Sequence, residues 1–175
     1  MGKNYAGVLI FFLVTLTVFG PTKAPCTCSF YKYCRCVMLN LTSIPQKLPI
    51  PRAESLSLTH NLITTLDQSD FSQHGLRRLD MGNNKIITIN NNAFYSLSNL
   101  TSLTLNSNLL TKLKPNMFTG LRNLDILRVN DNDIIDIQAG TFATMPKLTN
   151  LQLSRNKLTR LRFNMFKGLE NLTTT

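Results

Sequence analysis

The sequence contains no tryptophan, and acidic side chains are scarce in it. Nine aspartate and glutamate residues stand against 19 lysine and arginine residues, so the formal net charge is +10. The two histidines, His60 and His74, lie in no nucleophile motif. We find no glycine-rich phosphate loop, paired-carboxylate motif or metal-ligand cluster. We therefore expect no catalytic residue, no cofactor and no metal site.

No apolar run in the sequence has the length of a membrane-spanning helix. The longest covers residues 6–19 (AGVLIFFLVTLTVF), which is 14 residues, whereas a span needs about 20. Lys3 precedes this run, and the small residues Gly20, Thr22 and Ala24 follow it. This pattern predicts a signal peptide over residues 1–24 and therefore secretion, with a retained signal anchor as the alternative.

All four cysteines lie within eleven residues, at Cys26, Cys28, Cys34 and Cys36. An even, tight cluster in a secreted chain predicts two disulfides. A zinc site is disfavoured because the spacing is C-x-C and no histidine is near. In an antiparallel hairpin Cys26 would face Cys36 and Cys28 would face Cys34, close enough to bond. The crossed pairing remains open at this point.

The pattern LxLxxN recurs through the rest of the chain. Its asparagines are spaced 23, 24, 24 and 24 residues apart, and a phenylalanine follows each one ten residues later. The repeated residues are Asn61, Asn84, Asn108, Asn132 and Asn156, followed by Phe71, Phe94, Phe118, Phe142 and Phe166. This periodicity predicts five complete leucine-rich repeats and a truncated sixth that begins at Leu172.

Each position of the repeat has a physical reason. Leucines two residues apart on a short strand point to the same side, into a core, and stacked coils pair their strands into a parallel sheet. The asparagine amides can satisfy buried backbone groups of neighbouring turns. The phenylalanines form a spine on the opposite wall, where burial of each contributes roughly 1.5–3 kcal/mol. The prediction is an α/β solenoid.

The predicted organisation has three parts: a signal peptide over 1–24, a cysteine-rich cap over 25–52 and leucine-rich repeats over 53–175. No C-terminal cap is present, and an uncapped end would expose the core. We therefore expect a fragment of a longer protein. The alternative is a short product that dimerises through its open end.

The chain resembles extracellular leucine-rich-repeat proteins with a cysteine-rich N-terminal flank. The repeats match LxxLxLxxNxLxxLxxxxFxxLxx, and the flank matches through Cys26-Thr-Cys28, Cys36, Leu41, Ile44-Pro45 and Leu48-Pro49. Members include Toll-like receptors, leucine-rich-repeat and immunoglobulin-domain proteins, variable lymphocyte receptors and small proteoglycans. The resemblance implies a curved horseshoe with a parallel concave sheet and an irregular convex side. The family's usual first cysteine is missing here, and Cys34 replaces an apolar residue, which favours the nested pairing.

The phase of the repeat identifies the residues that face outward on the concave side. We predict that ligands contact Arg77, Arg78, Asp80, Thr104, Asn106, Ile126, Arg128, Asn130, Gln152 and Arg155. The formal charges of this face balance to zero over the five repeats. A nucleic-acid groove would be basic and interleaved with aromatics, so we do not expect nucleic acid as the primary partner.

Two further surface features stand out. A second basic surface carries Lys112, Lys114, Lys157, Arg160 and Arg162, which would suit a sulfated glycan or ordinary solubility. Sequons for N-glycosylation occur at Asn40, Asn99 and Asn171.

These features predict a protein that is secreted or lies on the extracellular side of the plasma membrane. We expect the N-terminal part of a receptor or adhesion ectodomain that binds a protein ligand or co-receptor through its concave face. Membrane attachment would come only from a region beyond residue 175. The alternative is a matrix protein that binds collagen-like fibres or glycans. Fold alone does not decide between them.

Overall fold

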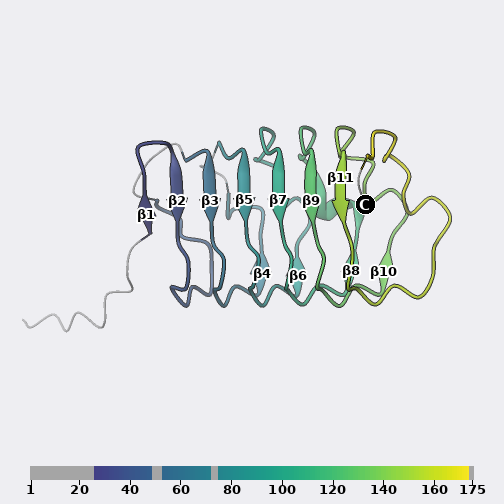
Figure 1. Ribbon diagram of the computed structural model, residues 1–175, viewed down its shortest axis with the longest axis horizontal. Coiled ribbons are helices and arrows are strands. Elements are labelled where there is room, and N and C mark those ends of the chain that lie inside the picture. The colour runs from purple at the N-terminus through teal and green to yellow at the C-terminus, as the bar shows by residue number, and fades with distance from the viewer. Residues whose placement is uncertain (1–25, 49–52, 72–74, 174–175) are drawn as a thin grey trace, which may run out of the picture.

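A computed structural model describes residues 26–48, 53–71 and 75–173 (Figure 1). The predicted signal peptide, the boundary between cap and repeats at residue 52, and His74 lie outside the described residues. None of the helices in the described part is long and apolar enough to cross a membrane.

One sheet of seven strands runs the length of the molecule, in the order β1-β2-β3-β5-β7-β9-β11 (Figure 1). Its first two strands pair antiparallel and every later pair is parallel. The strands are β1 (Thr27–Cys28), β2 (Tyr33–Arg35), β3 (Ser55–Ser57), β5 (Arg78–Asp80), β7 (Ser102–Thr104), β9 (Ile126–Arg128) and β11 (Asn150–Gln152).

The register of this sheet confirms the repeat. The middle residue of each repeat strand is a buried leucine, and these leucines pair from coil to coil as Leu56, Leu79, Leu103, Leu127 and Leu151. The residues on either side of each leucine point the opposite way, because side chains alternate along a strand. They form the outer face of the sheet, which we call the concave face.

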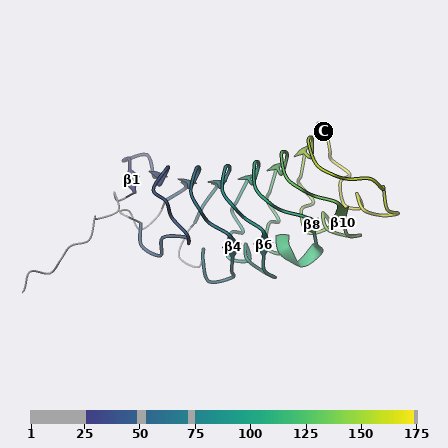
Figure 2. The same cartoon turned by 90° about the horizontal axis from the view of Figure 1, so that it is seen from below.

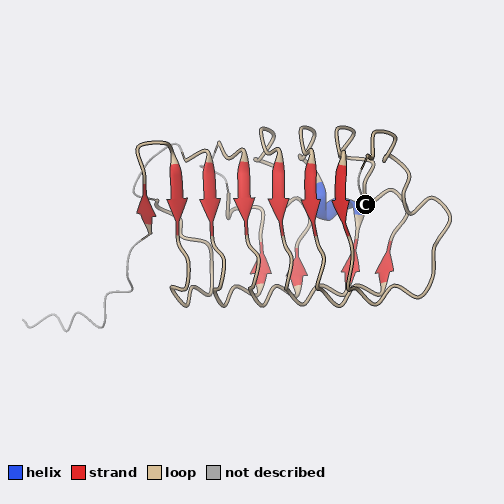
Figure 3. Cartoon of the chain, viewed as in Figure 1, coloured by secondary structure: helices blue, strands red, loops and turns tan. Residues whose placement is uncertain are grey.

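The opposite wall is irregular, as Figures 2 and 3 show. It contains two short parallel pairs and a single 3-10 helix among the described residues. The pairs are β4 (Thr65–Leu66) with β6 (Thr88–Ile89), and β8 (Lys112–Leu113) with β10 (Asp136–Ile137); the helix is η1 (Pro115–Phe118). The leucine-rich-repeat solenoid is therefore confirmed, with very little helix.

The repeat asparagines connect successive coils, as predicted. The Asn84 side-chain oxygen accepts a hydrogen bond from the Ile63 amide at 3.2 Å. Its nitrogen donates to the Met81 carbonyl of its own coil at 3.1 Å and to the Leu58 carbonyl of the preceding coil at 2.9 Å. Asn108 and Asn132 repeat this pattern. Each asparagine therefore satisfies buried backbone groups that the sheet leaves unpaired.

The phenylalanine spine is confirmed except at its last member. Phe71, Phe94, Phe118 and Phe142 are fully buried, and the Phe71 and Phe94 ring centroids lie 5.8 Å apart. Phe166 stacks on Phe142 at 6.3 Å but stays 42% exposed. The prediction of a buried Phe166 was wrong, because no described coil packs over it.

Two nested disulfides close the N-terminal end of the core. Cys26 bonds Cys36, and Cys28 bonds Cys34, which confirms the nested pairing and excludes the crossed one. Cys34 pairs in register with Leu56 and is completely buried. It occupies the place that a leucine takes in each repeat. The cap therefore packs on the first repeat in the way that one more coil would.

The buried leucine column predicts how a charge will affect the fold. We expect Leu105→Asp to destabilise the array by about 3–5 kcal/mol, because Leu105 is completely buried and no described core residue is a cation that could pair with an aspartate. Thr104→Asp is the matched control, since it places the same charge one residue away on the concave face. Thermal unfolding followed by circular dichroism measures both. Equal melting temperatures for the two variants would contradict the assigned orientation.

The disulfides predict where the structure loosens first. On mild reduction we expect amides at the cap–repeat junction, such as the Cys36 amide bonded to the Ser57 carbonyl, to exchange faster than those of β7. Disulfides act mainly by restricting the unfolded chain, and both bonds lie in the cap. Hydrogen–deuterium exchange measures this order. Simultaneous loss of protection in cap and central coils would show that the cap has no separate stability.

Candidate binding surface

The concave face is built from two parallel rows of side chains. The strand register lines them up, one residue per strand, roughly 4.8 Å apart. The first row is Tyr33, Ser55, Arg78, Ser102, Ile126 and Asn150, and the second is Arg35, Ser57, Asp80, Thr104, Arg128 and Gln152. Six of the ten predicted contact residues fall in these rows: Arg78, Asp80, Thr104, Ile126, Arg128 and Gln152.

The other four predicted residues lie at the edges of the rows. Arg77 precedes β5, and Asn106, Asn130 and Arg155 follow the ends of their strands. The structure therefore brings all ten to one side of the molecule, but only six of them lie on the sheet itself.

Sequence reasoning missed Tyr33 and Arg35, which the cap contributes to the two rows. Both side chains are exposed. A signal was available, because these two residues alternate with Cys34 and Cys36, and the cysteines must point into the core to form their bonds. The period of two along a strand would have placed their neighbours outside.

At the edge where the strands begin, Glu54 neutralises part of the positive charge. The Lys32 ammonium group contacts the Glu54 carboxylate, and the Arg77 Nε atom lies 3.8 Å from it. The hydrogen bond from Lys32, its charge and the more distant Arg77 together hold the pKa of Glu54 below its usual range. Arg77 is thus a less available contact residue than the sequence suggested.

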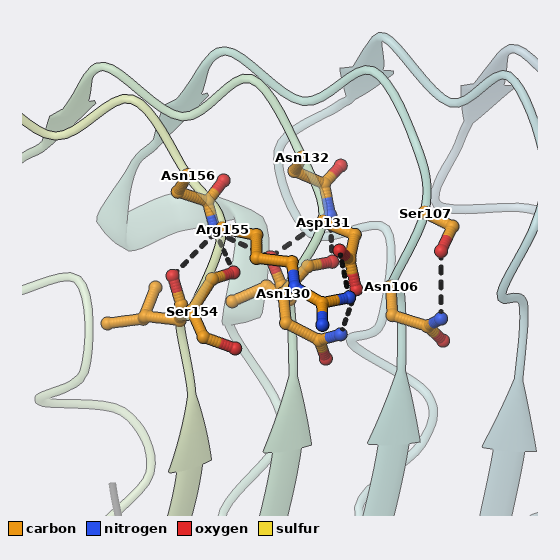
Figure 4. A network of polar contacts seen from close by, with 10 residues as sticks. Asn106, Ser107, Asn130, Asp131, Asn132, Ser154, Arg155 and Asn156 are labelled. Carbon is orange, nitrogen blue, oxygen red and sulfur yellow. Dashed lines mark hydrogen bonds and ion pairs between the residues drawn. The ribbon is translucent and has the colours of Figure 1, made fainter.

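At the opposite edge, the Asp131 carboxylate contacts two polar side chains, those of Asn130 and Arg155 (Figure 4). Asn130 donates a hydrogen bond to its carboxylate, and Arg155 Nη1 lies 3.1 Å from Asp131 Oδ1. The hydrogen bond from Asn130 and, after it, the contact with Arg155 lower the pKa of Asp131. One coil earlier Asn106 donates to the Ser107 hydroxyl at 3.0 Å. The predicted contact residues Asn106, Asn130 and Arg155 are therefore engaged within the protein.

Among the four concave arginines of the repeats, Arg78 and Arg128 differ from Arg77 and Arg155. Across the described residues neither side chain contacts a carboxylate, whereas Arg77 and Arg155 do. A guanidinium without an internal partner keeps its donors for a ligand. The four arginines therefore divide into two that complete the fold's own ion pairs and two that remain open.

A shallow hollow lies at the N-terminal end of the concave face. Its volume is about 200 Å³. It is lined by Tyr33, Ser55, Leu56, Ser57, Arg78, Leu79, Asp80, Ser102 and Thr104. The hollow exists because Ser55, which lies between Tyr33 and Arg78 in the first row, and the nearby Ser57 and Ser102 are small, so the larger side chains rise above them.

The second basic surface is partly neutralised. Lys157 lies 2.6 Å from Asp133, and Arg162 Nε lies 2.7 Å from Asp136. Each pair joins a cation of the last described coil to an acid of the coil before it. Lys112, Lys114 and Arg160 contact no carboxylate within the described ranges.

All three sequon asparagines are exposed. The Asn171 side-chain nitrogen donates to the Pro146 carbonyl at 2.9 Å. Glycosylation at Asn40, Asn99 and Asn171 stays a prediction. In the part of the chain that the structure describes, no group of three histidine, cysteine or acidic side chains gathers where it could hold a metal ion.

Comparison with known proteins agrees with this architecture. The family profile described as BspA type leucine-rich repeat region matches residues 52–175 in six copies. A crystal structure of a TLR13–ssRNA13 complex superposes with a TM-score of 0.71 and 30% sequence identity, over 76% of this chain. The present chain spans only 19% of the TLR13 chain. None of the curated proteins compared with the sequence matches it.

The profile covers well over half of the sequence, and its range includes every strand of the concave face from β3 to β11. The chain belongs to the leucine-rich-repeat proteins, in the BspA-type leucine-rich-repeat family.

Proposed function

We propose that this chain is an extracellular protein-binding module, the N-terminal part of a receptor or adhesion ectodomain. Its concave face binds a protein ligand or co-receptor. The observation that carries the proposal is the strip of outward side chains in which Arg78 and Arg128 contact no carboxylate of the described residues. Leucine-rich-repeat domains generally bind proteins on such extended surfaces and are typically non-catalytic.

The scaffold favours binding because its contact residues are already ordered. Each strand of the concave face is joined to its neighbours by backbone bonds and by a buried asparagine. A rigid surface loses little conformational freedom when a partner docks. Arginine and tyrosine are also the residue types that most often dominate binding energy in interfaces.

An extracellular location is supported by the cap and by the sequence before it. Both cysteine pairs of the cap are oxidised, as is usual for proteins of oxidising compartments. The apolar run at residues 6–19 fits a signal peptide over 1–24. We accordingly propose the division into signal peptide, cap at 25–52 and repeats at 53–175.

Two other partners have weaker support. The TLR13 structure contains RNA, but single-stranded nucleic acids need successive aromatic platforms, and Tyr33 is the single aromatic in the two described rows. A matrix role with collagen-like fibres or sulfated glycans is favoured by Lys112, Lys114 and Arg160, which contact no carboxylate in the part of the chain that the structure describes. These three residues lie off the concave face, so the two roles predict different binding surfaces.

A glycan placed on one face separates these roles. The double variant Thr104→Asn with Asn106→Thr creates a sequon in the middle of the concave face. Ala139→Asn creates one with Thr141 on the opposite wall, at an exposed residue that follows β10. The secreted chain, in an oligomerised form, is tested against a collection of secreted and cell-surface ectodomains.

We expect the concave glycan to weaken capture of the bound ectodomain by about tenfold or more, since a hot-spot contact is worth at least ~2 kcal/mol. The glycan at residue 139 should leave capture intact. Circular dichroism confirms that both glycoforms fold. Capture that survives the concave glycan and is lost with the opposite one, or no capture at all, contradicts the proposal.

A further inference from the structure

We infer that the N-terminal third of the concave face binds an acidic segment of the partner protein. Arg35 and Arg78 bind its carboxylates, and Tyr33 packs against its carbon chain. This inference rests on the proposed function and names the chemistry of the partner. It places the centre of the site at the junction of the cap with the first coils.

The geometry of the hollow supports this placement. Tyr33, Ser55 and Arg78 are consecutive members of one row, and Arg35 and Ser57 begin the other. Tyr33 and Arg78 therefore flank small serine residues, and a hollow of about 200 Å³ results. Arg35 does not line the hollow but lies beside Ser57 in the neighbouring row. A carboxylate-bearing side chain can enter from above and reach a guanidinium group while its methylenes lie along the tyrosine ring.

The local charge supports an acidic occupant. Arg35 and Arg78 contact no carboxylate in the described structure. Asp80 is the one acid that lines the hollow, and its Oδ1 atom accepts the Gly82 amide at 3.1 Å. Guanidinium groups bind carboxylates through two parallel hydrogen bonds, which makes a carboxylate the best-matched ligand.

The two ends of the concave face differ in their charge balance. At the N-terminal end, Glu54 is shared between two cations, Lys32 and Arg77, which leaves one charge in excess. Towards the last coils Asp131 holds Arg155, and the Thr149 hydroxyl donates to Asp125. Within the repeats the formal charges balance at both ends, so the positive excess at the N-terminal end comes from Lys32 and Arg35 of the cap.

Exposed aromatic side chains at the rim indicate a protein rather than a purely polyanionic partner. Phe30 and Tyr31 are 107% and 92% exposed, on the hairpin tip that the Cys28–Cys34 bond closes. The disulfide restricts the backbone of the hairpin that carries these rings, so less backbone freedom is lost when a partner covers them. A sulfated glycan presents mainly hydroxyl and sulfate groups, whereas a protein partner also carries apolar side chains that can cover both rings.

The span of the site predicts the length of the segment. Four strands, β2, β3, β5 and β7, contribute to the hollow. Three strand spacings of about 4.8 Å give roughly 14 Å. An extended peptide rises about 3.4 Å per residue, so about four or five residues cross the site.

The test uses the full secreted chain and a synthetic hexapeptide of alternating glutamate and leucine. NMR titration measures the affinity and maps the amides that shift. The matched peptide has glutamine in place of glutamate. Arg78→Gln and Arg35→Gln remove one guanidinium each. Arg122→Gln is the control, since Arg122 is exposed, lies on the other wall and contacts no carboxylate among the described residues.

We expect shifts confined to β2, β3, β5 and β7, and affinity about tenfold lower for the glutamine peptide and for Arg78→Gln, the size typical of a charge-assisted hydrogen bond. Arg35→Gln should weaken binding in the same direction, and Arg122→Gln should leave it unchanged. Equal affinity for both peptides, or equal losses in Arg78→Gln and Arg122→Gln, overturns the inference. So does tighter binding of heparin or a single-stranded RNA hexamer that Arg78→Gln does not weaken.

The peptide titration and the glycan-shielding assay can give opposite results, and each result tests a different claim. If the peptide does not bind while the concave glycan still blocks capture of an ectodomain, the partner chemistry is wrong and the proposed function stands. If the concave glycan has no effect either, the proposed function fails as well.

Discussion

The structure depends on the hydrogen bonds that each buried asparagine makes to two coils at once. In every internal coil one amide group satisfies a carbonyl of its own turn, a carbonyl of the preceding turn and a backbone amide of that turn. Without it these groups would be buried and unpaired, at a cost of about 1–3 kcal/mol each. The leucine column supplies hydrophobic burial, but apolar packing is not directional. The hydrogen bonds of the asparagines are directional. They therefore fix the register in which each coil packs on the one before it.

The constant register of the strands aligns outward side chains of successive repeats into one surface. Because the coils advance by one strand spacing without slipping, outward residues from distant parts of the chain form two straight rows. The cap extends these rows because Cys34 takes the place of a leucine. The disulfides therefore do more than cover the core: they also hold Tyr33 and Arg35 in line with Arg78. The family profile establishes that the chain is a leucine-rich-repeat protein. This surface is the basis of the proposed protein-binding role.

Much of the fold could be predicted from the sequence, because each coil repeats the same local pattern. Spacing alone predicted the strands, the asparagine bonds and the phenylalanine spine, and the missing family cysteine favoured the nested disulfides. The candidate site was less predictable. Charge counts treated Arg77, Arg78, Arg128 and Arg155 alike, whereas their difference lies in contacts about 24 residues apart, such as Arg155 with Asp131. Phe166 kept the pattern but lacked a covering coil, and Tyr33 lay outside the repeat phase.

The most direct test of the central claim is hydrogen–deuterium exchange of Asn108→Ala beside Asn106→Ala. Both variants remove the same group, but Asn108 is buried between coils, whereas Asn106 contacts the Ser107 hydroxyl on the surface. We predict that Asn108→Ala speeds amide exchange in the two coils that Asn108 joins, from the Ile86 amide across β5 and β7. Asn106→Ala should leave the exchange rates of these amides the same as in the parent protein. Equal protection in the two variants would contradict the claim that asparagines hold the coils in register.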